Sequence, residues 1–119
     1  MNKILIVEDD ADMIELLRIV FRSSGYDVTF SSMAPDVDHI IELRAELIVL
    51  DVRLKGSPIS GADLCKRLKS NPNTKQIPVI LASAEYNLAE IAKDCNADLF
   101  LAKPYDMLSL LLSINRFLL

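Results

Sequence analysis

The stretch ELIVLDVRLKGSPISG, residues 46–61, carries the clearest indication of the fold. Its apolar run, residues 47–50, has the length and composition of a strand that is buried on both faces of a sheet. The run ends on Asp51, although Asp is depleted in strands and a charge beside a buried sheet is costly unless it is paired. Asp51 is therefore either a turn residue that opens a loop or a residue placed there for chemistry.

The rest of the chain alternates short apolar runs with amphipathic segments. We expect strands at residues 3–7, 27–31, 47–50, 78–82 and 99–102, and helices at residues 13–21, 37–43, 62–69, 88–94 and 107–119. Strands and helices that alternate with short loops predict a parallel sheet with helices on both faces. The predicted fold class is α/β, doubly wound, with one domain over residues 1–119.

The bulk composition excludes several classes of protein. The 119 residues are 51% hydrophobic and 25% charged, which is typical of a soluble domain with a real core. The net charge is −4 and no block of Lys or Arg occurs, so we expect no direct binding of nucleic acid or of an anionic membrane. No apolar run approaches the roughly 20 residues of a membrane span, and the chain enters a strand at once, so we expect a cytoplasmic location.

The cysteines and the histidine indicate no metal site or disulfide framework. Cys65 and Cys95 are too few and too far apart in the sequence for either, and are expected to be buried or half-buried thiols in a reducing compartment. His39 has no Cys or second His nearby.

Polar and charged residues follow the predicted strands at the edge where open parallel sheets bind ligands, outside the carboxyl ends of the strands. The first strand is followed by Glu8, Asp9 and Asp10, the third by Asp51, the fourth by Ser83 and Ala84, and the fifth by Lys103 and Pro104. We therefore expect carboxylates, a hydroxyl and an ammonium to meet at one edge of the sheet.

This combination of groups predicts a magnesium-assisted phosphoryl transfer. Clustered carboxylates repel one another unless a cation binds, and Mg²⁺ prefers one or two carboxylates together with a phosphate. The cluster lacks the Cys or His that would favour zinc. Lys103 and Ser83 would hold oxygens of the phosphoryl group, and Asp51 would attack it to form an aspartyl phosphate.

The sequence resembles the receiver domain of two-component response regulators along its whole length. The matching motifs are ILIVEDD at 4–10, LIVLD at 47–51, PVILASA at 78–84 and AKPYD at 102–106. The resemblance implies a flavodoxin-like (βα)5 sandwich with a five-stranded parallel sheet in the order 2-1-3-4-5. It also implies a signalling protein that is not a turnover enzyme, because its only reactions are self-phosphorylation and autodephosphorylation.

The resemblance further implies the roles of the residues around the predicted cation. Asp51 would be the phosphoacceptor and a metal ligand, and Glu8 and Asp9 the acidic pair, with Asp9 the direct ligand of Mg²⁺. The backbone carbonyl of Arg53 would be a further ligand, and Mn²⁺ an alternative ion.

The same resemblance implies the residues that handle the phosphoryl group and pass on the signal. Lys103 and Ser83 would be catalytic, the backbone of Ala84 would contact the phosphate, Ser83 and Phe100 would form the switch, and Pro104 would follow a cis peptide bond. A sensor histidine kinase or phosphotransfer protein would donate the phosphoryl group. A face formed by the fourth helix, fifth strand and fifth helix would bind an output partner or a second copy.

The loop after the predicted phosphoacceptor departs from the family. Gly61 lies ten residues after Asp51, about two more than is usual there, and Lys55 stands where the family often has Pro. Flanking residues suggest a modulating role: Arg53 and Glu85 should overhang the site and could pair to restrict the attack of water. The alternative is that these are two solvated surface charges.

Two further departures lie in the second half of the chain. CNAD, residues 95–98, replaces a glycine-containing turn, and Asn96 can adopt the left-handed conformation that such a turn requires. The last helix is unusually apolar. One stripe is expected to pack on the sheet: Met107, Leu110, Leu111, Ile114, Phe117 and Leu118. A second stripe, which either packs under the first helix or forms an apolar docking face, consists of Leu108, Leu112 and Leu119.

Three other functions share parts of this pattern. A pseudo-receiver, which is an interaction module without phosphorylation, normally loses one of the site residues that this chain retains. A phosphatase of the haloacid-dehalogenase type would need a second Asp where Arg53 stands. A flavin carrier would need a loop rich in Ser, Thr or Gly where this chain has EDDAD, residues 8–12.

Overall fold

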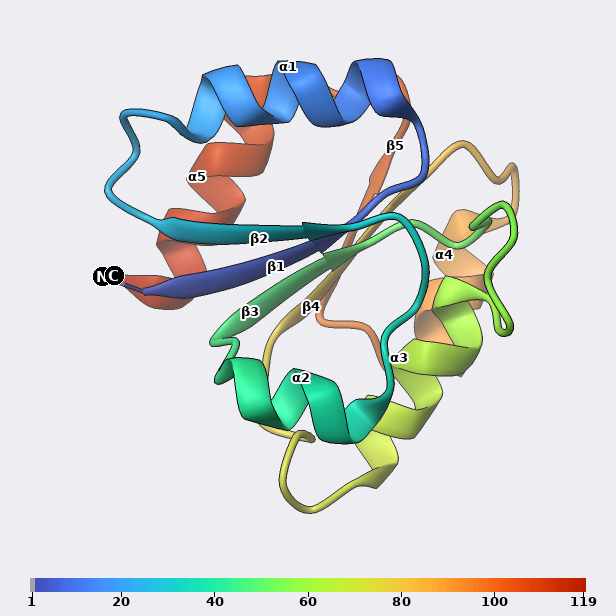
Figure 1. Ribbon diagram of the computed structural model, residues 1–119. Coiled ribbons are helices and arrows are strands. Elements are labelled where there is room, and N and C mark those ends of the chain that lie inside the picture. The colour runs from blue at the N-terminus through green and yellow to red at the C-terminus, as the bar shows by residue number, and fades with distance from the viewer. Residues whose placement is uncertain (1) are drawn as a thin grey trace.

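The computed structural model describes residues 2–119, in which five strands alternate with five helices (Figure 1). The strands are β1 (Lys3–Val7), β2 (Asp27–Ser31), β3 (Leu47–Leu50), β4 (Val79–Ser83) and β5 (Leu99–Ala102). The helices are α1 (Ala11–Phe21), α2 (Val37–Leu43), α3 (Gly61–Ser70), α4 (Leu88–Asp94) and α5 (Met107–Leu118).

The five strands form one parallel sheet in the order β2-β1-β3-β4-β5. Helices α1 and α5 cover one face of this sheet, and α2, α3 and α4 cover the other (Figure 1). The doubly wound α/β fold and the predicted strand order are therefore confirmed.

Two hydrophobic cores lie on the two faces of the sheet, and the central strands supply both. Along β1, Leu5 and Val7 point into the core under α2, α3 and α4, whereas Ile4 and Ile6 point into the core under α1 and α5. This alternation follows from the two-residue period of a strand, and it explains why the central strands are apolar at nearly every position.

The register of the sheet brings the strand ends together. Val7 pairs with Leu50, so the segments that follow β1 and β3 begin at the same level, and Leu50 pairs with Leu81, two residues before β4 ends at Ser83. At the other edge of β4, Ser83 pairs with Ala102, which places the residue after β5 beside them. The polar residues predicted to meet are carried to one edge in this way.

Several boundaries differ from the predicted ones because capping residues extend the elements. Helix α1 begins at Ala11 because the carboxylate of Asp10 accepts hydrogen bonds from the backbone N–H groups of Asp12 and Met13. Helix α3 begins at Gly61 because the hydroxyl of Ser60 caps it through the N–H of Asp63.

The backbone features expected in the second half of the chain are present. Asn96 has a φ of 61°, in the left-handed region, and the Lys103–Pro104 peptide bond is cis. Cys65 and Cys95 are both buried, and the Cys65 thiol donates to the carbonyl of Cys95 at 3.3 Å. Burial raises the pKa of the Cys65 thiol.

Helix α5 corrects one prediction and settles an open one. Phe117 is exposed, so its place in the sheet-facing stripe is wrong. Leu108, Leu112 and Leu119 are exposed as well, Leu119 at 90%, so this second stripe does not pack under α1. Asn115 accepts a hydrogen bond from the hydroxyl of Tyr26, which lies in the α1–β2 loop. Leu112 and Leu119 are three and four residues from Asn115 and so share its side of the helix. The stripe is therefore exposed to solvent, on the side of α5 that is nearer to α1.

No helix within residues 2–119 is both long enough and apolar enough to cross a membrane.

Candidate functional site

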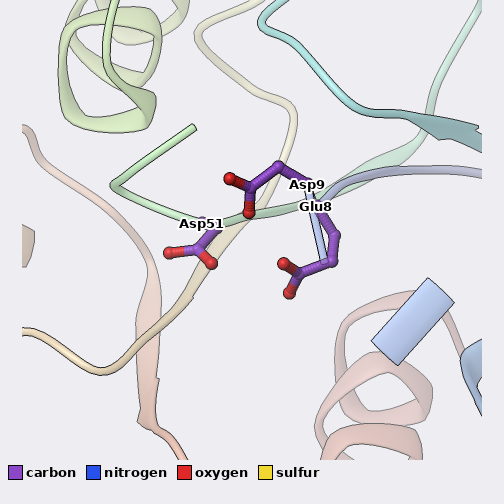
Figure 2. A group of neighbouring side chains, drawn as sticks. All are labelled: Glu8, Asp9 and Asp51. Atoms are coloured by element: carbon purple, nitrogen blue, oxygen red, sulfur yellow. The ribbon is translucent and has the colours of Figure 1, made fainter. Parts of the chain in front are cut away.

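Three carboxylates from two strand ends form an acidic cluster at the carboxyl edge of the sheet. Glu8 and Asp9 follow β1, Asp51 follows β3, and one carboxylate oxygen of each lies within 4.8 Å of the others (Figure 2). Glu8 and Asp51 are buried, whereas Asp9 is half-buried. Such a cluster is stable only if cations neutralise it, because carboxylates at this separation repel one another.

Lys103 is the cation that the chain itself supplies. Its Nζ donates hydrogen bonds of 2.6 Å to Oε1 of Glu8 and of 2.7 Å to Oδ2 of Asp51. Burial alone would lower the pKa of Lys103, but the hydrogen bonds and charges of Asp51 and Glu8 outweigh it and raise this pKa. The ammonium is therefore firmly charged and bridges the ends of β1, β3 and β5.

Glu8 is the most deeply buried member of the cluster, with 3% of its surface exposed. Its Oε2 accepts a hydrogen bond from the N–H of Asp10 at 3.1 Å, while its Oε1 accepts from Lys103. Burial raises the pKa of Glu8 despite these two donors, which act in the opposite direction. Both oxygens of Glu8 are thus engaged by the protein.

The chemistry of the remaining donors fits a hard divalent cation. Asp9 and Asp51 retain oxygens that accept no hydrogen bond within residues 2–119, and no Cys or His belongs to the cluster. Oxygen-only ligands of this kind suit Mg²⁺ or Mn²⁺. Because Glu8 is held by Lys103 and Asp10, it is better placed to orient its neighbours than to bind a cation directly.

A cavity of ≈ 330 Å³ opens above the cluster. Ser83, which is only 2% exposed, and Ala84 line it from the end of β4. Every predicted catalytic, metal-binding and modulating residue borders this cavity, namely Glu8, Asp9, Asp51, Arg53, Ser83, Ala84, Glu85 and Lys103. The residues predicted to share a site therefore lie together, and their roles stay predictions.

Arg53 and Glu85 form an ion pair across the mouth of this cavity, between Nε of Arg53 and Oε1 of Glu85. The Arg53 side chain is 85% exposed and that of Glu85 is largely buried. The pairing expected from their positions is present, and it joins the β3–α3 loop to the β4–α4 loop.

Phe100 stands apart from the cavity. It lies on the edge strand β5 with 43% of its surface exposed, and it is not among the residues that line the cluster. Its ring is therefore turned outward in this structure, toward the face of the molecule formed by α4, β5 and α5.

Two backbone contacts at the site were not predicted from the sequence. A Cβ on Gly61 would lie 1.7 Å from the carbonyl oxygen of Asp51, so only glycine fits where α3 begins against the end of β3. The N–H of Lys55 donates a hydrogen bond of 2.8 Å to Oδ2 of Asp9. The one available signal was the departure of the 51–61 loop from the length and composition usual in similar sequences.

A second and larger cavity, of ≈ 1080 Å³, lies beside the first and was also not predicted. One wall is the β3–α3 loop with Leu54, Pro58 and Ile59, and the other consists of Tyr86 in the β4–α4 loop and Ile91 of α4. Asp9, Arg53 and Glu85 border both cavities, so the long loop is part of the surroundings of the acidic cluster.

Comparison with known proteins agrees with this geometry. Among curated proteins, the DNA-binding dual master transcriptional regulator RpaA of Synechocystis sp. (strain ATCC 27184 / PCC 6803 / Kazusa) is 31% identical over 126 residues, covering 99% of this chain and 49% of that protein. The DNA-binding response regulator MtrA of Mycolicibacterium paratuberculosis (strain ATCC BAA-968 / K-10) is 29% identical over 107 residues, covering 87% and 45% respectively. The chain spans about half the length of these curated relatives.

A solved structure of similar extent is the signal receiver domain of a signal transduction histidine kinase from Syntrophus aciditrophicus. It matches with a TM-score of 0.86 and 30% identity, and the match covers 99% of this chain and 90% of that one. The family model described as response regulator receiver domain matches residues 4–115. With the acidic cluster, the lysine and the sheet order in place, this match shows that the chain belongs to the family of response regulator receiver domains.

Proposed function

We propose that this receiver domain accepts a phosphoryl group on Asp51 from the phosphohistidine of a sensor kinase or phosphotransfer protein. One observation carries the proposal: a buried Asp51 holds a charged Lys103 at 2.7 Å and lies beside Asp9, which has an oxygen to spare. Buried carboxylates are costly, and neighbouring ones also repel one another. A cluster that keeps three of them is therefore expected at a site that binds a cation and an anionic ligand.

In the proposed reaction an oxygen of Asp51 attacks phosphorus. The new O–P bond forms as the N–P bond of the phosphohistidine breaks, and the electron pair returns to the imidazole nitrogen. Lys103 and Ser83, with the backbone N–H of Ala84, would bind the phosphoryl oxygens and so stabilise their charge in the transition state. Asp9, Asp51 and the backbone carbonyl of Arg53 would hold Mg²⁺, or Mn²⁺, which when bound supplies further positive charge to those oxygens.

The proposed switch links Ser83 to Phe100 through β4 and β5. Ser83 is buried at the site and pairs directly with Ala102, and Phe100 lies on the same edge strand. Movement of Ser83 toward a phosphoryl group would leave space into which the exposed Phe100 ring could turn, and the α4–β5–α5 face would repack. A partner that reads this face would then distinguish the two states.

The ion pair between Arg53 and Glu85 would tune how long the phosphorylated state lasts. It spans the mouth of the cavity above Asp51 and therefore narrows the path of an attacking water. Because Arg53 is largely exposed and the pair is screened by solvent, its effect should be modest.

The partners of the protein, including nucleic acid, can be proposed only in general terms. The charge balance predicts that this domain does not bind nucleic acid directly, but RpaA and MtrA, each about twice its length, are named as DNA-binding, so the comparisons do not support that prediction. We propose that this domain regulates an output partner, or a second copy, through the α4–β5–α5 face. A cytoplasmic location stays a prediction.

The alternative is a pseudo-receiver that binds partners without being phosphorylated. Intact-mass spectrometry after incubation with Mg²⁺ and acetyl phosphate decides between the two functions, with Asp51→Asn as the matched control. A mass gain of one phosphoryl group in the wild type and none in the variant is expected. A wild type without mass gain, and without a rise in melting temperature on adding Mg²⁺ and beryllofluoride, would establish the pseudo-receiver.

A further inference from the structure

The β3–α3 loop reaches the acidic cluster through its backbone. Lys55 lies four residues after Asp51, the proposed phosphoacceptor. Its N–H donates a 2.8 Å hydrogen bond to Oδ2 of Asp9. Within residues 2–119 this is the one hydrogen bond that the Asp9 carboxylate makes. The contact therefore fixes the orientation of the Asp9 carboxylate, whose other oxygen accepts no hydrogen bond within residues 2–119.

The donor sits in a tight turn. The N–H of Ser57 bonds the carbonyl of Leu54 at 3.1 Å, and Gly56 has a φ of 75°, which are the features of a type II turn with Lys55 as its second residue. Proline is favoured at that second position because its φ matches, but proline has no N–H. Because Lys and not Pro occupies position 55, the turn keeps the backbone N–H that proline would lack.

The loop that holds this turn is fixed at several points. The hydroxyl of Ser57 accepts from the N–H of Ala34 at 3.0 Å and donates to the carbonyl of Ile59 at 2.8 Å. The N–H of Gly61 bonds the carbonyl of Val52 at 2.8 Å, which closes the loop at its far end. The Lys55 side chain is exposed and forms no salt bridge or hydrogen bond with Asp9 within residues 2–119, so the contact is made by the backbone.

From this geometry we infer that the N–H of Lys55 is a positioning group that prepares Asp9 for a divalent cation. One oxygen of the carboxylate is held by the loop, the other accepts no hydrogen bond within residues 2–119, and the carboxylate lies beside those of Glu8 and Asp51. Holding a ligand in place before binding lowers the ordering cost that binding would otherwise incur. A residue other than proline at position 55 thus has a use at the metal site. This inference rests on the proposed function, because it concerns how the proposed Mg²⁺ ligand is oriented.

Lys55→Pro tests the inference, with Lys55→Ala as the matched control. Both variants lose the ammonium, both suit the turn, and only Lys55→Pro loses the N–H. The readout is the dissociation constant of Mg²⁺, from calorimetry or from the rise of melting temperature with Mg²⁺ concentration. We expect Lys55→Ala to bind within about twofold of wild type, and Lys55→Pro to bind about threefold to tenfold more weakly, which matches the modest net contribution of a typical hydrogen bond.

The outcomes separate this inference from the proposed function. Equal Mg²⁺ affinity in Lys55→Pro and Lys55→Ala, with binding intact in the wild type, overturns the positioning role and leaves the proposed metal site standing. A wild type that binds no Mg²⁺ overturns both. A structural role alone would lower the melting temperature of Lys55→Pro without Mg²⁺ and leave its response to Mg²⁺ unchanged, which also contradicts the inference.

A measurement on the wild type covers the case in which Lys55→Pro does not fold. In amide NMR spectra, the Lys55 N–H should shift strongly and exchange more slowly with solvent on titration of Mg²⁺. The N–H of Ser57, which bonds within the turn, should respond much less. A Lys55 amide that ignores saturating Mg²⁺ would overturn the inference.

Discussion

The central strands and the edge strand β5 carry different parts of the candidate site. Strands β1 and β3 are apolar at nearly every position, packed on both faces, and end in Glu8, Asp9 and Asp51. Strand β5 is half-exposed along its length and carries Phe100 on its open side. The three carboxylates of the candidate site therefore follow strands that are packed on both faces, and the proposed signalling residue lies on a half-exposed edge strand, where the chain is freer to move.

Gly61→Ala should produce the largest effect, because it disturbs the rigid centre directly. The new Cβ would lie 1.7 Å from the carbonyl oxygen of Asp51, so α3 and the end of β3 must separate. We expect a loss of about 3 kcal/mol or more in the free energy of unfolding, measured by urea denaturation. Gly56→Ala is the control: its φ of 75° is strained for Ala but nothing lies within 4 Å, so it should cost about 1 kcal/mol. Equal losses in both would contradict this account of Gly61.

Lys103→Met should have the next largest effect, a loss of about 3 kcal/mol in the free energy of unfolding near neutral pH. The substitution leaves Glu8 and Asp51 without their ammonium partner. The loss should depend on pH. Removing Lys103 takes away two influences that lower the pKa of Glu8, so this already raised pKa rises further. A raised carboxyl pKa favours the folded state below the unfolded value, 4.5, and the advantage disappears as pH rises through the folded pKa.

Denaturation of Lys103→Met at several pH values measures this dependence. The deficit relative to wild type should be small near pH 4 and should grow toward pH 7. Lys69→Met serves as a comparison, since Lys69 bonds Asp98 and two carbonyl oxygens at the opposite edge of the sheet. A pH-independent deficit in Lys103→Met would show that the cluster is not held by the lysine charge.

Arg53→Ala and Glu85→Ala should have a smaller effect, on a rate and not on stability. Each removes the ion pair at the mouth of the cavity, and loss of the phosphoryl group from Asp51 should become about twofold to fivefold faster, consistent with the strength of an exposed pair. The rate is followed by intact mass after removal of the phosphodonor. Unchanged rates in both variants would reduce Arg53 and Glu85 to ordinary surface charges.

Phe100→Ala should have the smallest effect on stability, about 0.5 kcal/mol or less, because the ring is already partly in solvent. Its phosphorylation should proceed at the wild-type rate, since Phe100 does not border the cavity. If instead this variant destabilises the fold as much as Lys103→Met, then β5 is as rigid as the centre and the contrast between the strands fails.

Much of the fold could be predicted because burial on both faces leaves a plain pattern in the sequence. Strands 3–7, 27–31, 47–50 and 99–102 have the predicted bounds, whereas the strand predicted at 78–82 is one residue later, Val79–Ser83. Ends set by side-chain caps were missed: Asp10 was interpreted as part of the acidic edge, but its carboxylate caps α1. The prediction for Phe117 was wrong because helical spacing shows which residues share a face of the helix, but not how much of that face the sheet covers.

The candidate site, like the fold, could be predicted in part. Parallel strands of known order bring their carboxyl ends together, so Glu8, Asp51 and Lys103 could be placed without a structure. The contacts of Lys55 and Gly61 could not, because backbone N–H and carbonyl groups occur at nearly every residue and leave no trace in sequence. Only the path of the loop decides which of them meets Asp9 or Asp51.

The two buried cysteines give this chain an internal probe of local opening. A hydrogen bond from Cys65 of α3 to Cys95, the residue after α4, lies in the core under α2, α3 and α4, and α4 is one element of the face that the proposed switch would repack. A thiol reagent can reach them only when this packing opens, so the rate of labelling measures the frequency of that opening. Compared with and without beryllofluoride, the labelling rate would show whether occupation of the Asp51 site tightens or loosens the helical layer on that face of the sheet, with no residue changed.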